Sequence, residues 1–185
     1  MKKVVIAIII VVVLIAIYAF STYNTLITLG VTADTQWKQV ETQYQRRFDL
    51  IPNLVEIVKG VAKQEQTVFG DIAEARTRYS GATTADDRAK AASQVEGAIG
   101  RLLVIAENYP TLKSSDSFQT LMSQLEGAEN RVSVERTRYN EYVRNYNLKV
   151  MRVPSSIIAL IFGFDEKEYF NSEAGAEKAP KVDFE

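Results

Sequence analysis

The sequence contains neither cysteine nor histidine among its 185 residues. Disulfide frameworks, thiolate nucleophiles and zinc sites built from Cys or His are therefore excluded. Only 4 Pro and 9 Gly are present, which indicates long regular elements rather than many turns. Neither sign of charge predominates, since 22 basic side chains stand against 23 acidic ones, so the totals predict no nucleic-acid partner. The composition is therefore typical of a helical protein that lacks several of the side chains common in catalytic and metal-binding sites.

A long apolar run lies near the start of the chain. Residues 4–20 are all apolar, Lys2 and Lys3 precede them, and the next charge is Asp34. Together with the three following residues the run spans about 30 Å at ~1.5 Å per residue, enough to cross a hydrocarbon core. It exceeds the apolar core of a signal peptide, and Ala19-Phe20-Ser21 is a poor cleavage site. The sequence therefore predicts an uncleaved anchor over residues 1–23.

Charge and aromatic residues predict the orientation of this anchor. Lys2 and Lys3 lie before it and no Lys or Arg follows until Lys38, so the positive-inside rule places the N-terminus in the cytoplasm and the remainder outside. Aromatic side chains are expected at the outer membrane interface. They are Tyr18, Phe20 and Tyr23.

Beyond the anchor, apolar residues recur every three or four positions, as in helices packed along one stripe. We expect helices over about 24–50, 53–80, 84–109 and 116–152. Gly30 is the expected bend between the anchor and the first of these helices. The predicted fold is all-α: a transmembrane helix continuing into an up-and-down four-helix bundle over 24–153.

The predicted helix ends rest on local signals. Pro52 either marks a tight turn between two helices, which we favour, or kinks one long helix. Thr84 is the expected cap of the third helix, with Asp87 at the capping-box position. Ser114, Ser115 and Asp116 supply cap oxygens for the fourth.

Two segments follow the last predicted helix. Residues 154–164 are apolar but too short to span a membrane, so they either cover the open end of the bundle core or lie in the outer membrane interface. Their candidate contact residues are Ile157, Leu160, Phe162 and Phe164. Residues 165–185 are polar and have no helical stripe, and composition alone predicts a mobile tail.

Several polar residues lie on or beside the predicted apolar stripes. They are Arg47, Asn53, Glu65, Arg76, Glu107, Glu129, Arg138, Asn140 and Asn147. We interpret them as a structural network that pairs charges across helices and bridges backbones through Asn amides. In the alternative interpretation, Glu65, Glu107 and Glu129 gather as carboxylates for acid–base work or a hard cation. No phosphate-binding loop or nucleophile elbow occurs, so no catalytic, metal or cofactor residue is assigned.

A strip of small residues runs along the third predicted helix. It comprises Ala89, Ser93, Gly97 and Gly100. Small side chains allow close approach of a neighbouring backbone. A tightly packed neighbour within the chain is the favoured interpretation, and a subunit contact is the alternative.

Short motifs along nearly the whole chain resemble the LemA family. The matching stretches are Tyr23-Asn24-x-Leu26, Arg46-Arg47-x-Asp49-Leu50-Ile51-Pro52-Asn53-Leu54-Val55, Glu107-x-Tyr109-Pro110-x-Leu112-Lys113, Arg138-Tyr139-Asn140, Tyr146-Asn147 and Ala179-Pro180-Lys181-Val182-Asp183-Phe184. One departure is Lys63-Gln64-Glu65, where many members place His before the Glu.

The resemblance implies a single-pass bacterial membrane protein with an extracytoplasmic helical bundle and no settled biochemical activity. It weakly implies an envelope partner such as a membrane zinc protease. It also implies that the C-terminal residues dock through Val182 and Phe184, against the mobile tail that composition predicts. We therefore expect a non-enzymatic scaffold or adaptor in the inner membrane, in contact with the lipid bilayer and self-assembling into a homo-oligomer. The alternative is a bundle that senses a ligand or metal through its core carboxylates.

Overall fold

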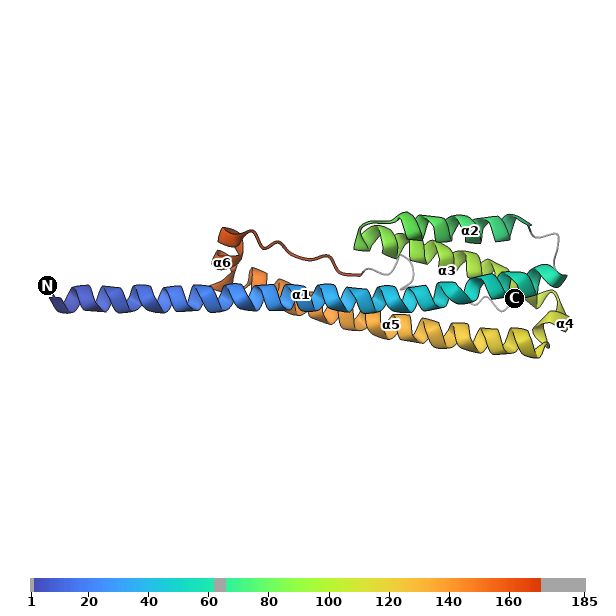
Figure 1. The fold of residues 1–185 in the computed structure, drawn as a ribbon, viewed down its shortest axis with the longest axis horizontal. Helices are drawn as coiled ribbons and strands as arrows, with labels where there is room; N and C mark the ends of the chain where they lie inside the picture. The colour runs from blue at the N-terminus through green and yellow to red at the C-terminus, as the bar shows by residue number, and fades with distance from the viewer. Residues whose placement is uncertain (1, 62–65, 171–185) are drawn as a thin grey trace, which may run out of the picture. The chain divides into compact units, whose positions relative to one another are not determined.

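The structure is a computed structural model that describes residues 2–61 and 66–170. All regular elements among these residues are helices (Figure 1). They are α1 (Lys2–Val61), α2 (Gln66–Gly81), α3 (Ala85–Glu107), α4 (Pro110–Lys113), α5 (Asp116–Met151) and α6 (Ser155–Phe162). The all-α prediction is confirmed.

The described residues form two compact units. Unit 1 combines the chain up to Gln39 with Arg136–Tyr169, and unit 2 combines Val40–Glu135 with Phe170. Each of the two longest helices, α1 and α5, therefore contributes to both units. The predicted single bundle over 24–153 is thus divided between two clusters of contacts.

The predicted turn at Pro52 is wrong. α1 continues through Pro52 to Val61, so the boundary expected between residues 50 and 53 does not exist. A proline inside a helix removes one backbone hydrogen bond and costs about 3 kcal/mol. Ile51 and Leu54, which flank it, are completely buried and keep the apolar stripe in register. Their burial offsets the local cost at about 1.5–3 kcal/mol for each large side chain.

Gly30 does not interrupt α1 either. The helix passes through Gly30, and a Cβ atom placed there would lie 3.4 Å from the ring of Tyr146 on α5. That distance is an ordinary van der Waals contact, so the ring of Tyr146 packs on this part of α1. Gly30 thus lies in the packed contact between α1 and α5 rather than at a break in the helix.

The start of α1 is long and apolar enough to cross a membrane, and it is the only such helix among the described residues. None of its most apolar window is buried within the chain. Further along the same helix, apolar residues at the predicted helical spacing are buried: Leu26, Ala33, Val40 and Tyr44. One helix thus joins an exposed apolar stretch to a packed core.

The core of unit 2 brings α1, α2 and α3 together around aromatic rings. The ring of Tyr79 on α2 lies 5.7 Å from Tyr44 and 4.5 Å from Phe48 on α1. Val95 and Leu102 of α3 are completely buried. Aromatic pairs at these spacings add to the stability that their buried area provides.

The helix starts follow the predicted caps. The Asp87 backbone N–H donates to Thr84 Oγ1 over 3.1 Å at the start of α3. The Phe118 N–H donates to Ser115 Oγ over 3.4 Å at the start of α5. α2 begins at Gln66 rather than near residue 53, and residues 62–65, between α1 and α2, lie outside the described ones.

In unit 1, α6 packs across α1 and α5. Leu26, Tyr146 and Ala159 form its buried cluster, against which Leu29, Val150 and Phe164 pack. Gly163 ends α6 with a φ of 71°, in the left-handed region that favours glycine. The Phe164 N–H then donates to the Ala159 carbonyl over 2.9 Å, and the chain turns back toward α5.

Candidate functional site

The polar centre of unit 2 is an ion cluster around Arg47. This α1 side chain is only 10% exposed, and its Nη1 lies 3.0 Å from Glu96 Oε1 on α3. The same nitrogen contacts Glu129 Oε2 on α5. Arg47 and Glu129 thus pair across helices, as the sequence predicts for a structural network. The sequence prediction does not include Glu96, although it is the only charged residue between Lys90 and Arg101 and lies beside the buried residues Val95 and Ile99.

The other predicted members of the network differ in their exposure. Asn53, Glu107 and Arg138 are exposed, and Arg76 and Asn140 are half-buried. Glu65 lies outside the described residues. Of the three carboxylates of the metal interpretation, the described Glu107 is exposed and Glu129 pairs with Arg47. Among residues 2–61 and 66–170, no group of three acidic side chains is placed to hold a metal ion.

Asn147 bridges to a backbone segment instead of to another helix side chain. Its side chain is buried in unit 1, and Nδ2 donates to the Lys167 carbonyl over 2.8 Å. In return the Lys167 N–H donates to Asn147 Oδ1 over 2.8 Å. The amide thus satisfies both backbone groups of one residue, as a neighbouring β-strand would.

Two further side chains hold the same segment. The Tyr139 hydroxyl donates to the Glu168 carbonyl over 3.1 Å. Lys167 Nζ lies 2.7 Å from Asp34 Oδ1 on α1 and 5.5 Å from the centre of the Tyr146 ring. We call residues 165–169 the return segment. The expectation that everything after residue 164 forms a mobile tail is therefore wrong for these residues, and Val182 and Phe184 lie outside the described residues.

Tyrosines of both units have raised pKa values. Burial raises the pKa of Tyr79 from 10.0 to about 12. Burial, followed by the negative charges of Asp34 and Glu168, raises the pKa of Tyr139. Burial, followed by Asp165 and Asp34, raises that of Tyr146. Each shift favours the neutral phenol, as expected of hydroxyls placed for packing and hydrogen bonding.

The small-residue strip on α3 divides into a buried and an open part. Ala89 is buried and Ser93 is half-buried, whereas Gly97 and Gly100 are exposed. A Cβ atom at either glycine would meet nothing within 4 Å among the described residues. Val104, one turn beyond Gly100, is 62% exposed. The favoured interpretation of a tight internal neighbour does not hold at Gly97 and Gly100.

A groove runs between α3 and α5 in unit 2. One part has a volume of about 450 Å³ and is lined by residues including Leu103, Phe118 and Met122. An adjoining part of about 400 Å³ shares Leu103 and Met122 and reaches Arg47 and Glu129. Both parts are open to solvent, which suits a shallow contact better than the enclosure of a small molecule.

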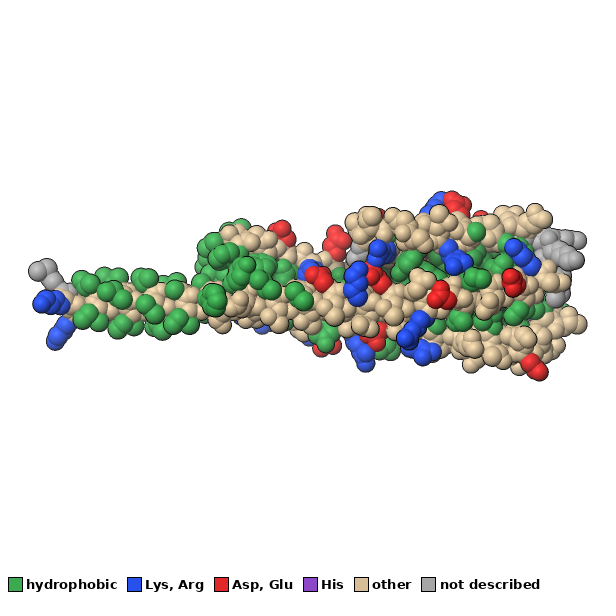
Figure 2. All heavy atoms as spheres, viewed as in Figure 1, with side chains coloured by type: hydrophobic (Ala, Val, Ile, Leu, Met, Phe, Trp, Pro, Cys, Tyr) green, Lys and Arg blue, Asp and Glu red, His purple; other side chains and the backbone are tan. Residues whose placement is uncertain are grey.

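Exposed apolar residues gather in unit 1, on α6 and on the first part of α1 (Figure 2). Tyr18 and Phe20 of the predicted aromatic belt are exposed. Tyr23 is half-buried because its ring lies 4.9 Å from Phe162 and 5.6 Å from Phe164.

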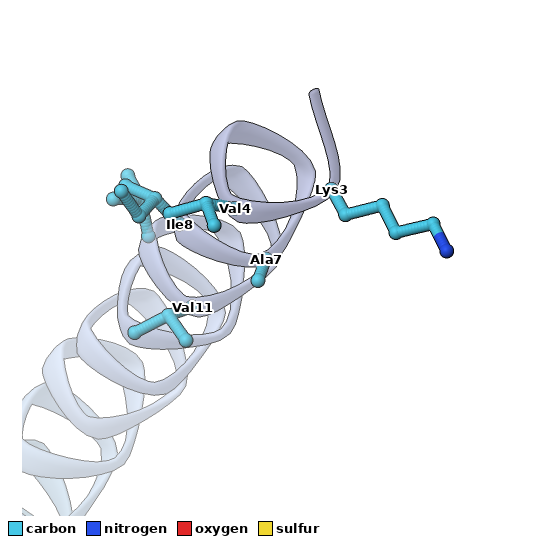
Figure 3. Close-up of a pocket in the computed structure, with 6 residues that line it drawn as sticks. Lys3, Val4, Ala7, Ile8 and Val11 are labelled. Atoms are coloured by element: carbon cyan, nitrogen blue, oxygen red, sulfur yellow. The ribbon is translucent and has the colours of Figure 1, made fainter. Parts of the chain in front are cut away.

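A shallow hollow near the start of α1 does not form a binding site. Lys3, Val4, Ala7, Ile8 and Val11 border it, and all of them belong to one helix (Figure 3). A single helix supplies no opposing wall to enclose a ligand.

Comparison with known proteins places the chain in a family. Residues 36–184 match the model of the LemA family. Magnetosome proteins MamQ 1 and MamQ 2 of Paramagnetospirillum magneticum are each 26% identical to the chain, over 84% of it and 66% of their own length. Magnetosome protein MamQ of Magnetospirillum gryphiswaldense is 25% identical with the same coverage. The chain thus spans about two thirds of these relatives. Because the family match covers most of the chain, the protein belongs to the LemA family.

Proposed function

We propose that this protein is a membrane-anchored, non-enzymatic scaffold or adaptor of the bacterial cell envelope, acting through protein–protein contacts and self-assembly. The observation that carries the proposal is that α1 combines a membrane-length apolar part with a part that packs in a folded core. Its first part is apolar and exposed, while its later part supplies buried core residues such as Val40 and Tyr44. Because one continuous helix holds both parts, it couples a membrane anchor directly to a folded contact surface.

The anchor is proposed to cross the inner membrane once, with the N-terminus in the cytoplasm. Lys2 and Lys3 before the apolar run support this orientation. The absence of native cysteine makes the test direct. A Cys replacing exposed Tyr142 should react with a membrane-impermeant maleimide added outside spheroplasts. A Cys replacing Lys3 should react only after the membrane is broken, and the reverse pattern would contradict the orientation.

Unit 2 is proposed to be a four-helix arrangement. Its α1 residues contact α2 through Tyr44 and Tyr79, α3 through Arg47 and Glu96, and α5 through Arg47 and Glu129. Contacts from one helix to three others support a bundle with Arg47 at its centre. A unit built almost entirely of packed helices is suited to presenting contact surfaces, because helices hold their side chains in fixed positions.

The open part of the α3 strip is the proposed self-assembly surface. Gly97, Gly100 and Val104 lie at helical spacing on one exposed side. Full-length protein in mild detergent should have the mass of a discrete oligomer by light scattering corrected for the micelle. A monomeric mass, together with no crosslinking in the membrane, would contradict self-assembly and leave a one-to-one adaptor.

A substitution pair tests this surface directly. Gly100→Leu introduces bulk into open space, so the single chain should fold at least as stably as the parent, since leucine favours helix more than glycine by almost 1 kcal/mol. The oligomer should nevertheless dissociate. Gly70→Leu on α2 is the matched control, because its Cβ position is equally open. Equal masses for the two variants would remove Gly100 from the interface.

An envelope partner is part of the proposal. The family resemblance suggests a membrane protease as one partner. A photoreactive group at exposed Val134 or Val104, followed by identification of the crosslinked protein, tests it. Recovery of only this chain would support self-assembly without such a partner.

The alternative function is a binding module, and one observation favours it. Arg47 borders the α3–α5 groove, and its Nε has no hydrogen-bond acceptor among the described residues. Against a metal, Arg47 already pairs with Glu129 and Glu96. If a metal binds, the purified protein should retain it through dialysis and lose it in Glu129→Ala. Absence of metal from the dialysed parent would contradict the metal form of this function.

A further inference from the structure

The helix α6 presents a large apolar face that nothing in unit 1 covers. Leu160 is 84% exposed and Ile161 is 68% exposed, whereas Ala159 on the opposite side is buried. Val153 and Met151, just before α6, are also exposed. No charged residue occurs from Val153 to Phe164. An uncharged, exposed apolar helix of this kind marks an interaction surface.

The position of α6 along α1 identifies the level at which this face lies. Phe162 and Phe164 pack their rings on Tyr23. Tyr23 lies 19 residues after Val4, where the apolar run begins, and thus about 29 Å along the helix at ~1.5 Å per residue. A hydrocarbon core is about 30 Å thick. If α1 spans it, Tyr23 and the rings against it lie at the boundary between lipid tails and headgroups.

We propose that the exposed face of α6, made by Ile157, Leu160, Ile161 and Phe162, is inserted in the outer leaflet interface as a second membrane contact. This inference rests on the proposed anchoring of α1. Figure 2 shows the apolar surface of α6 beside that of α1, so the two are continuous. That continuity is the reason to assign the face to lipid rather than to a second copy of the chain.

The chemistry around α6 also fits an interface. Aromatic rings at the headgroup level are typical of membrane-interface belts, and Tyr23, Phe162 and Phe164 form such a group. Exposed Arg152 directly precedes the uncharged segment, where its guanidinium can reach lipid phosphate. An interfacial helix buries its apolar face in the acyl boundary and keeps charge at the surface.

A second contact would have a mechanical consequence for unit 1. α6 is held to α1 and α5 through the cluster of Leu26, Tyr146 and Ala159. The Asn147 amide additionally holds the return segment that follows α6. With α1 crossing the membrane and α6 lying on it, rotation of unit 1 about the α1 axis and its tilt would both be restricted. The interface helix would thereby present the extracytoplasmic surfaces in a defined direction.

The test uses single cysteines in the full-length protein, which has none of its own. Leu160→Cys is labelled with the fluorophore NBD and reconstituted into vesicles of phosphatidylethanolamine and phosphatidylglycerol. Shallow nitroxide-labelled lipid should quench this label several times more than it quenches a label at Val134→Cys. Val134 is an exposed apolar residue of unit 2, outside the proposed membrane contacts. Iodide in the aqueous phase should instead quench the label at Val134 more than the label at Leu160.

A label at Ile10→Cys separates failure of this inference from failure of the anchor. If Ile10 is quenched by lipid and Leu160 only by iodide, α6 lies in water and the inference is overturned while the anchor stands. If the label at Leu160 is protected from both quenchers, and the unlabelled Leu160→Cys protein forms a disulfide with its copy on oxidation, a second chain covers the face and the inference is again overturned. If Ile10 itself is accessible to iodide, the anchor fails and the inference fails with it.

Discussion

Replacing Arg47 tests whether the ion cluster of unit 2 is a structural element. The Arg47 side chain is 10% exposed, whereas those of Glu96 and Glu129 are 29% and 40% exposed. Arg47→Met keeps an apolar stem in place but leaves two carboxylates without their shared cation. The loss of stability then depends on how far water reaches the two glutamates.

The magnitude follows from two limits. Breaking a fully buried ion pair costs about 3–5 kcal/mol, and losing a hydrogen bond to a charged group costs about 1.5–3 kcal/mol. Because both carboxylates remain partly accessible, we expect about 2 kcal/mol, near the lower range. For a chain of this size each kcal/mol lowers the melting temperature by about 2–4 °C, so Arg47→Met should melt about 4–8 °C lower.

Circular dichroism during heating, in the detergent used for purification, measures this change. Arg78→Met is the matched control, because Arg78 pairs with Glu74 over 2.6 Å on the surface of α2, with both side chains more than half exposed. Exposed pairs of this kind contribute about 0.5 kcal/mol. Equal melting temperatures for the two variants would refute the structural role of Arg47.

A compensated variant separates charge from packing. Adding Glu96→Gln and Glu129→Gln to Arg47→Met removes the two carboxylate charges that Arg47 contacts and should recover most of the lost stability, since neutral replacement of a whole buried ion group is often tolerated. If the triple variant is no more stable than Arg47→Met, the loss comes from packing of the guanidinium and not from its charge.

Three further predictions concern single side chains. Asn147→Ala should remove hydrogen-exchange protection at the Lys167 amide and cost about 1–3 kcal/mol, since two partly buried backbone groups lose their partner; unchanged protection would contradict the role of these two hydrogen bonds. Gly163→Ala should destabilise the end of α6 by about 1 kcal/mol, because φ is 71° while the space for a Cβ is open; an unchanged melting temperature would argue against that conformation. Tyr79 has a folded-state pKa of about 12, above its usual 10.0, so its contribution is complete below pH 10 and is lost as pH rises through 12. Tyr79→Phe should therefore show a smaller alkaline loss of stability in melts between those pH values, and an identical loss would contradict the shift.

Much of the helical organisation could be predicted from local patterns. The apolar residues 4–20 identify a membrane-length helix, because length and hydrophobicity alone decide whether a segment can span. The buried positions Leu26, Val40 and Tyr44 follow from helical periodicity. Thr84 caps α3 through a hydrogen bond within one turn, a contact that neighbouring residues determine.

The candidate surfaces could be predicted only in part. The sequence places Arg47 and Glu129 in a structural network, because charged residues on or beside an apolar stripe need partners. Their shared contact with Glu96 depends on the rotation of α3 against α1, which periodicity does not specify. The spacing of small residues along the sequence predicts the strip on α3. Whether Gly97 faces a neighbour or solvent, however, depends on the packing of the other helices.

The sequence by itself determined the all-helical class, the apolar anchor and the stripe that each helix buries, because these depend on residues close together in the chain. The tertiary structure alone decided that α1 passes through Pro52, since burial of Ile51 and Leu54 outweighs a local signal for a turn. It also decided that Asn147 holds Lys167, and that the rings of Phe162 and Phe164 pack on Tyr23. These contacts join residues far apart in the chain, and their energies exceed the local preferences from which a sequence prediction is made.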